Sequence, residues 1–246
     1  MSTTVIDVAP RGADAAYALS GELIVPRLVA RRGRRVEVAL VAGRAMLLPG
    51  DHVHLDVRVG EGCTLALVDI GGLVVYGRPE LGDEPSGWHA EITLAPGARL
   101  TWEGLPTVVT ADGELLRSSV LRLASGSSVA LRETLVLGRA GEAGGRLRSD
   151  LDATDATGPL LRESLEVRGD RPEPGVLGRS RVMDTVIVLG ERLGPVDEAD
   201  IARLDLAGEG TTLRYLGDAA HHSPLGELWR SAVAAPRETE VLACAG

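Results

Sequence analysis

A strand-turn-strand unit occurs three times in the first half of the chain and constrains its fold more than any other feature. The copies span residues 54–67, 90–102 and 119–131. In each copy apolar and polar residues alternate, a small residue and a glycine follow, and the alternation then resumes. Alternation with a period of two places successive side chains on opposite faces of a sheet, and glycine adopts turn conformations that a Cβ atom disfavours. Each unit is therefore predicted to be either a β-hairpin or a strand pair that turns a corner.

The turn glycines of the three copies, Gly62, Gly97 and Gly126, are 35 and 29 residues apart. Regular copies of one unit predict a stacked architecture in which neighbouring units bury each other's apolar faces. Two further strands are expected before the first copy, at 16–30 and 34–48. We therefore expect a mainly β protein, with a stacked β-helix-like or β-sandwich-like domain and one or two short C-terminal α-helices.

The whole chain, residues 1–246, is predicted to form this single domain, since 246 residues can bury one full-sized core. The β body is expected at about 16–190 and a mixed segment at about 191–246. The sequence DRPEPG at 170–175 is the best linker in the chain.

The C-terminal segment contains one strong helix prediction, at Ser223–Val233. Ser223 suits the N-cap, and apolar residues recur after it at spacings of three and four. A weaker helical stretch is Val196–Arg203, where acidic residues favour the positive end of a helix dipole. For Trp229 two interpretations stay open, packing on the β core and contact with a partner.

The composition argues against several function classes. The formal charge is −9 and the chain has no Lys, whereas a general nucleic-acid binder needs a basic face to displace counterions. Cys63 and Cys244 have no paired spacing, so we expect neither a disulfide framework nor a thiolate metal site, and a reducing, cytoplasmic setting. The N-terminus lacks a signal-peptide pattern, and no stretch reaches the roughly 18 apolar residues of a membrane span.

The sequence Asp51-His52-Val53-His54-Leu55-Asp56 is the sharpest local chemical feature. On a strand, His52, His54 and Asp56 share one face, and the apolar residues that follow them face the core. Imidazoles and a carboxylate on one face suit a borderline metal such as nickel or zinc. The pattern also matches the H-x-H-x-D stretch of metal-dependent hydrolases. The alternative is the polar outer face of an edge strand.

Glu133 and Glu163 lie inside apolar strand patterns, beside Arg132 and Arg162 on the opposite strand face. A carboxylate that points into a protein interior is costly unless it is paired, hydrated or bound to a metal. If they point inward, these acids line a wet passage; if outward, they are solvated. No serine elbow and no phosphate-binding glycine loop accompany them, which argues against nucleophilic catalysis and nucleotide hydrolysis.

Several motifs, taken in order over residues 20–232, resemble the urease accessory protein UreD family, called UreH in some organisms. The matching positions are Gly50-Asp51, Tyr76, Trp102, Leu137-Gly138-Arg139 and Leu160-Leu161-Arg162-Glu163. The family's longer glycine-rich motif is reduced here to Pro49-Gly50-Asp51, and the lysine of its K-x-Y strand is Val74. The chain therefore resembles a divergent, short member.

The resemblance implies a non-enzymatic protein that helps to insert nickel into apo-urease. Members bridge urease to UreF, which recruits the GTPase UreG, and nickel travels through an internal passage. Carried over by position, the transient nickel path is Asp51, His52, Glu133 and Glu163, with no permanently bound cofactor. The partner contacts expected are Tyr76 and Trp229.

Two other interpretations accompany this one. A metal-dependent hydrolase would use His52, His54 and Asp56 and would hold its metal tightly. A plain β interaction module would dock partners and would have no passage.

Overall fold

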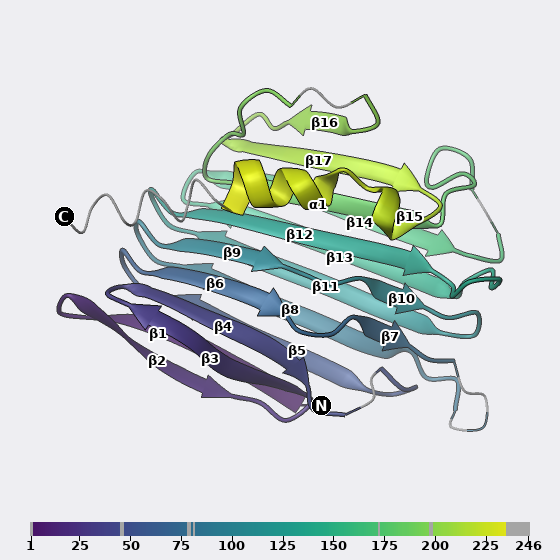
Figure 1. The fold of residues 1–246 in the computed structure, drawn as a ribbon, viewed down its shortest axis with the longest axis horizontal. Helices are drawn as coiled ribbons and strands as arrows, with labels where there is room; N and C mark the ends of the chain where they lie inside the picture. Colours follow the sequence, from purple (N-terminus) through teal and green to yellow (C-terminus); the bar gives the residue numbers. More distant parts are fainter. Residues whose placement is uncertain are drawn as a thin grey trace.

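The structure, a computed structural model, describes residues 2–44, 47–77, 80, 82–171, 173–196 and 199–234. Its strands form two sheets that stack as a solenoid around one apolar core (Figure 1). The predicted mainly β, stacked fold is confirmed, and the described part contains one short C-terminal α-helix.

Sheet A has seven strands. In spatial order they are β14 (Gly158–Arg168), β13 (Arg146–Asp155), β11 (Glu114–Leu123), β8 (Ser86–Leu94), β5 (His52–Val59), β1 (Ser2–Arg11) and β2 (Asp14–Ser20). The pairs from β1 to β13 are parallel, and the outermost strands, β2 and β14, are antiparallel to their neighbours.

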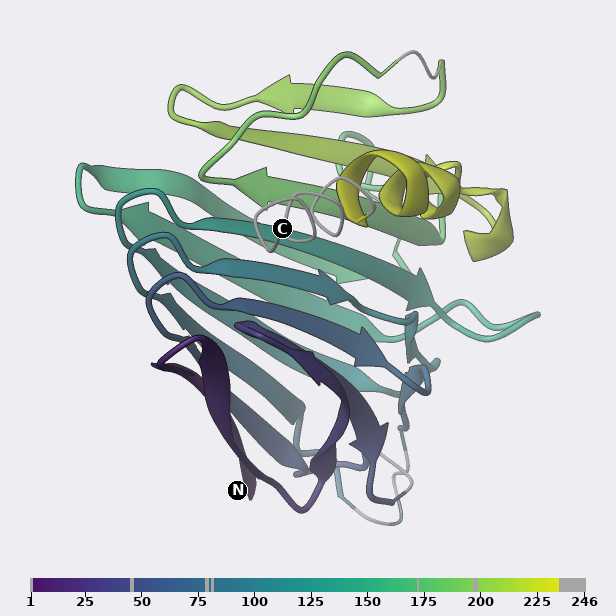
Figure 2. The ribbon, with the colours of Figure 1, turned by 60° about the vertical axis from the view of Figure 1, so that its left-hand side comes forward.

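Sheet B has ten strands. The main path is β16 (Ala202–Asp205), β17 (Gly210–Gly217), β15 (Val182–Leu189), β12 (Ser128–Leu137), β9 (Arg99–Glu103), β6 (Thr64–Asp69), β4 (Arg35–Ala42) and β3 (Ile24–Arg32). Two short strands extend it, β7 (Leu73–Val75) and β10 (Thr107–Val109). Figure 2 shows the two sheets from the side, with the helical segment lying on sheet B.

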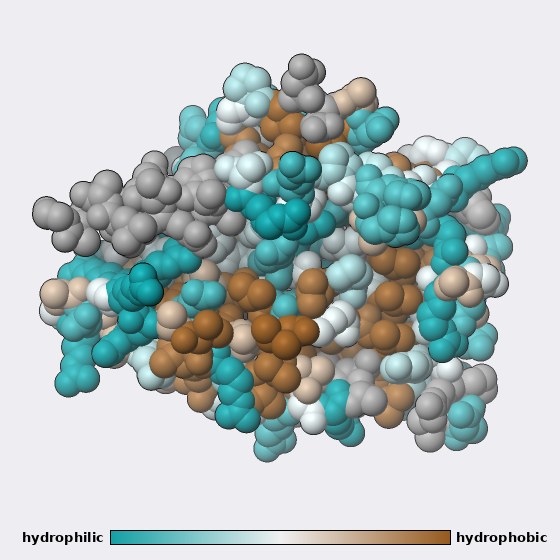
Figure 3. Space-filling model, viewed as in Figure 1, coloured by the Kyte–Doolittle hydropathy of each residue, from teal (hydrophilic) through white to brown (hydrophobic). Residues whose placement is uncertain are grey.

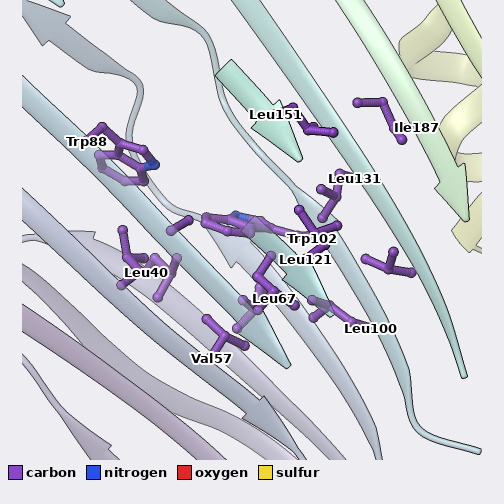
Figure 4. Close-up of a cluster of buried hydrophobic side chains, with 14 of the residues drawn as sticks. Leu40, Val57, Leu67, Trp88, Leu100, Trp102, Leu121, Leu131, Leu151 and Ile187 are labelled. Carbon is purple, nitrogen blue, oxygen red and sulfur yellow. The ribbon is translucent and has the colours of Figure 1, made fainter. Parts of the chain in front are cut away.

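Each repeat turns a corner between the sheets, because its first strand belongs to sheet A and its second to sheet B. The three turn glycines have φ values of +61° to +66°, in the left-handed region that favours glycine. Of the two interpretations of the repeat, the corner is confirmed and the hairpin is wrong. Successive copies pair in parallel and in register, so that Leu67, Trp102 and Leu131 align across sheet B. These three side chains meet Val57 and Leu121 of sheet A in the core (Figure 4).

The C-terminal helix is confirmed, although it is short. It comprises α1 (Leu225–Leu228) and a π-helical turn, η3 (Trp229–Ala234), preceded by the 3-10 turn η2 (Ala220–His222). The N-cap is Pro224 and not the predicted Ser223, although the backbone N–H of Leu225 donates to Ser223 Oγ at 3.2 Å. Within the described residues, no helix combines the length and the apolar composition needed to cross a membrane.

Some predicted elements differ from the structure. The weak helix at Val196–Arg203 is wrong where the chain is described, because Ala202–Asp205 forms an edge strand on β17; Asp197 and Glu198 lie outside the described residues. The stretch at 170–175, whose Pro172 is not described, belongs to the connection from β14 to β15.

The strand bounds differ as well. The predicted strand at 16–30 is divided between β2 and β3 by a turn at 21–23. Strands also extend beyond the predicted 16–190 body at both ends, from Ser2 to Gly217.

Candidate functional site

One layer of polar side chains crosses the apolar interior between the sheets. Asp69 ends β6 and Glu133 lies on β12. Each lies two residues after a strand position whose side chain faces the core, so its own side chain is on the same face. The repeat explains their alignment, because Asp69, Gly104 and Glu133 occupy equivalent positions after Gly62, Gly97 and Gly126. A Cβ atom at Gly104 would lie 2.9 Å from the Arg132 carbonyl oxygen, so the position between the two acids has no room for a side chain.

Arg117 projects from β11 of sheet A into this layer, and its guanidinium forms an ion pair with the Glu133 carboxylate. Both side chains are mostly buried, at 11% and 20% exposure. They line a small cavity of about 30 Å³ together with Asp69, Trp88 and Trp102. That volume is enough for a water molecule, which needs at least about 10–15 Å³.

Two buried donors in the cavity wall, Arg117 Nε and Trp88 Nε1, have no hydrogen-bond partner among the residues that the structure describes. Buried polar groups without a partner are rare, and an ordered water is a common partner. The cavity is therefore polar and fits a small hydrated species better than an apolar ligand.

Asp69 is the second acid that lines the cavity. Its carboxylate accepts hydrogen bonds from Trp102 Nε1 at 3.0 Å and from the backbone N–H of Leu105 at 3.1 Å. Burial raises the pKa of Asp69, and these two hydrogen bonds and the nearby Arg117 partly offset that rise.

A second ion pair also joins the two sheets. Glu163 of β14 accepts two hydrogen bonds from Arg214 Nη2 of β17, both at 2.8 Å. The register of sheet B places Glu133, Thr185 and Arg214 side by side on neighbouring strands, and Arg214 Nε donates to Thr185 Oγ1 at 3.2 Å. Glu133 and Glu163 thus belong to one polar row on the facing sides of the two sheets. Glu133 is 20% exposed, whereas Glu163, on the edge strand of sheet A, is 35% exposed.

The other two residues of the predicted nickel path lie at the start of β5, Asp51 just before the strand and His52 as its first residue. Asp51 accepts a hydrogen bond from the backbone N–H of Leu48 at 2.9 Å and pairs with Arg44 at 2.6 Å. His52 is exposed, and its ring lies over Gly87 of β8, where a Cβ atom would be 2.2 Å from Nδ1. Within the described residues, the hydrogen bonds and the ion pair of Asp51 do not lead to Glu133 or Glu163.

Tyr76 and Trp229, the predicted partner contacts, lie in different surroundings. Tyr76 lines an open cleft of about 470 Å³ together with acidic residues that include Glu84, Asp112 and Glu114. Trp229 is 2% exposed and packs with Leu225, Tyr215 and other apolar residues on the outer face of sheet B. Its burial favours the packing interpretation of this tryptophan.

The predicted face of β5 is confirmed, because Val53 and Leu55 are buried while His54 and Asp56 are partly exposed on the other face. The ligand set expected for a hydrolase is nevertheless not the one assembled. Asp56 pairs with Arg58 through two hydrogen bonds of 3.1 and 2.5 Å. Parallel pairing instead sets His54 directly beside His89 of β8.

Four of the residues that matter here were not predicted from the sequence: Asp69, His89, Arg117 and Arg214. The register of the repeat indicates two of them, His89 and Asp69. His54 and His89 precede their turn glycines by the same number of residues, and Asp69 and Glu133 follow theirs equally. Arg117 and Arg214 have no such signal, since their partners come from the opposite sheet.

Comparison with known proteins identifies the family. The profile described as UreD urease accessory protein matches residues 19–241. Urease accessory protein UreD 1 of Streptomyces griseus subsp. griseus is 40% identical over 222 residues, which cover 86% of this chain and 84% of that protein. Urease accessory protein UreD of Parafrankia sp. is 31% identical, covering 80% and 75% of the two chains. UreD of Frankia alni is 34% identical, covering 74% and 69%.

The match extends over most of the described strands, including both sheets and the helical segment that covers sheet B. This chain therefore belongs to the UreD family of urease accessory proteins.

Proposed function

We propose that this chain acts in urease maturation as a scaffold that binds apo-urease and UreF and lets nickel pass along its interior polar row. UreG would be reached through UreF, and the setting would be the cytoplasm. In this role the chain binds its cargo transiently and breaks no covalent bond. Family membership supports the role in urease maturation, and the route and the partners are our proposal.

The observation that carries the proposal is a row of carboxylates that runs from the apolar interior of the solenoid to its edge at β14. Asp69, Glu133 and Glu163 are the acids of this row, and each has a definite partner in the described structure. Ionised groups inside a core contribute little net stability compared with well-packed apolar residues. A functional role for charged groups in the interior explains their presence better than a contribution to stability does.

The arginines that pair with these acids suit transfer of an ion better than storage. Arg117 and Arg214 satisfy Glu133 and Glu163 while no ion is present. An incoming divalent cation has to displace a guanidinium, which weakens its net binding. Conduction requires sites that an ion can leave as well as reach, and oxygen ligands of modest affinity meet that condition.

Docking is supported by the outer face of sheet B beside the helix. Figure 3 shows hydrophobic residues gathered below α1, over β4, β6 and β7. Ile70 and Leu105, which follow strands of this sheet, are 59% and 36% exposed. Contiguous exposed apolar surface is typical of protein–protein contacts, which fits a chain that bridges partners.

The test replaces Glu163 with glutamine, which keeps the shape of the side chain and removes its charge. Urease is activated with complexes that contain either Glu163→Gln or the unchanged chain, and nickel per urease and urease activity are measured. We expect both to fall at least about tenfold, the lower end of the effect of changing groups that support a metal site.

Glu166→Gln is the matched control, because Glu166 lies on the same strand with an exposed side chain. It should activate urease normally. Complex assembly is followed by size-exclusion chromatography, so that lost docking is told apart from lost transfer. Normal nickel content with Glu163→Gln in an intact complex would remove Glu163 from the route.

A further inference from the structure

We propose that the outer face of sheet A carries a separate binding site for one borderline divalent cation, made by His54, His89 and Glu91. The site goes beyond the proposed nickel route, since it lies on the opposite side of the sheet from the interior row. Its ligands would be two imidazole nitrogens and one carboxylate oxygen. We expect zinc or nickel to be the cation.

The three groups converge in the structure. One ligand atom from each residue can be chosen so that all lie within 4.8 Å of one another. The rings of His54 and His89 have centroids 4.7 Å apart with a tilt of 31°. His89 Nε2 lies 3.3 Å from Glu91 Oε1. Zinc binds such nitrogens and oxygens at roughly 2.0–2.2 Å, so the three side chains would turn toward one common point to hold it.

The backbone beneath the site is fixed by sheet pairing. His54 of β5 is the direct parallel partner of His89 of β8, and Asp56 is the partner of Glu91. The residues that alternate with them, Leu55 and Ala90, are buried in the core. A site on the central strands of a rigid sheet keeps its geometry better than a site on loops.

Ser118 of β11 continues the row and supplies a second contact to one imidazole. Its hydroxyl lies 2.5 Å from His89 Nδ1 and pairing sets Ser118 beside His89. Histidines that bind metals usually make a hydrogen bond through their other ring nitrogen, which fixes the ring orientation. This contact leaves Nε2 of His89 directed to Glu91 as the ligand atom, and makes Ser118 a positioning residue.

An unsatisfied atom also points to a ligand. Nδ1 of His54 is buried and has no hydrogen-bond partner among the described residues. A purely structural surface histidine would place both nitrogens in water or in hydrogen bonds. A cation, or a water bound to it, would supply the missing partner.

The donor set selects the class of cation. Two imidazoles and one carboxylate suit zinc and nickel, whereas magnesium and calcium take all-oxygen sets. Glu91 is partly exposed, so a site with three protein ligands keeps open positions for water.

The experiment uses the full chain after treatment with a chelator. Zn²⁺ and Ni²⁺ are titrated separately by calorimetry, and Co²⁺ is added as a spectroscopic probe of the ligand set. The unchanged chain should bind one ion per molecule at this site. His54→Gln and His89→Gln should each weaken that binding at least about tenfold, and Ser118→Ala should weaken it with the stoichiometry unchanged.

The control is the double variant His221→Gln and His222→Gln, which removes an exposed histidine pair elsewhere with ring centroids 4.2 Å apart. It should retain the site.

The imidazole resonances of His54 and His89 should shift when Zn²⁺ is added, which gives a readout that needs no variant. The proposal is overturned if no ion binds, if the His54 and His89 variants bind as tightly as the unchanged chain, or if only the His221 and His222 variant loses binding. Glu133→Gln and Glu163→Gln should leave this binding intact, so failure here and failure of the nickel route are distinguishable.

Discussion

Two aspartates inside the protein, Asp184 and Asp69, are held in different ways. Asp184 is fully buried under the helical segment and accepts hydrogen bonds from Arg132 Nη2 at 2.9 Å and from Thr134 Oγ1 at 3.0 Å. Asp69 accepts hydrogen bonds from uncharged donors, Trp102 Nε1 and the backbone N–H of Leu105. A guanidinium therefore pairs with Asp184, whereas uncharged N–H groups hold Asp69.

Replacing Arg132 with methionine should destabilise the protein by about 3 kcal/mol, because it leaves a buried carboxylate without its cation. Arg122→Met is the control, since Arg122 is exposed on sheet A and should change stability by no more than about 0.5 kcal/mol. Urea unfolding of both variants measures the difference. Equal losses would show that Asp184 does not need Arg132.

The raised pKa of Asp69 predicts how the free energy of unfolding changes with pH. Burial raises its pKa in the folded state, so the folded protein holds this proton more tightly than the unfolded chain does. Its contribution to stability is then fully present below the unfolded pKa of about 3.9 and is lost as the pH rises through the folded pKa. Unfolding free energies of the unchanged chain and of Asp69→Asn, compared from about pH 4 upward, should show the advantage of the unchanged chain decreasing. An advantage that grows with pH would contradict the inward placement of this acid.

At the scale of elements, the corner turns set the stacking of the repeats. Gly97 has a φ of +65°, and a Cβ atom there would meet nothing nearer than 4.0 Å. A side chain at this turn is therefore disfavoured by the backbone conformation and not by crowding. The same conformation at Gly62 and Gly126 lets each unit pass from sheet A to sheet B in the same way.

Gly97→Ala should accordingly cost about 1–2 kcal/mol, the penalty of a left-handed conformation for a residue with a Cβ atom. Gly71→Ala is the matched control, because Gly71 has open space around it and no positive φ. Urea unfolding compares the two. A loss at Gly71 as large as the loss at Gly97 would mean that the turn conformation is not the cause.

The type of an element was predictable where it depends on a local pattern of residues. The prediction failed where pairing with a neighbouring strand decides the type. The alternation around each turn glycine predicted the strands correctly, and the apolar spacing predicted the helix on which Trp229 lies. At Ala202–Asp205 the acidic residues before it suggested a helix, but pairing with β17 makes an edge strand. Edge pairing is a tertiary interaction, and it overrides a weak local helix propensity.

At the scale of the whole molecule, the sequence singled out two of the acids but left their orientation open, and their partners were not predictable. The strand patterns singled out Glu133 and Glu163, and the structure places both between the sheets. Arg117 and Arg214 come from the opposite sheet in each case. Contacts across the interior depend on how the two sheets face each other, which alternation within one strand does not encode.

The solenoid combines a rigid apolar body with a charged interior row. We propose that nickel reaches urease along that row. The most direct measurement is the time course of nickel incorporation into apo-urease by the assembled complex, with Glu133→Gln compared with Glu166→Gln. We expect incorporation to slow at least about tenfold with Glu133→Gln and to stay unchanged with Glu166→Gln. Equal incorporation by both complexes would contradict passage through the interior and would leave docking as the role of this chain.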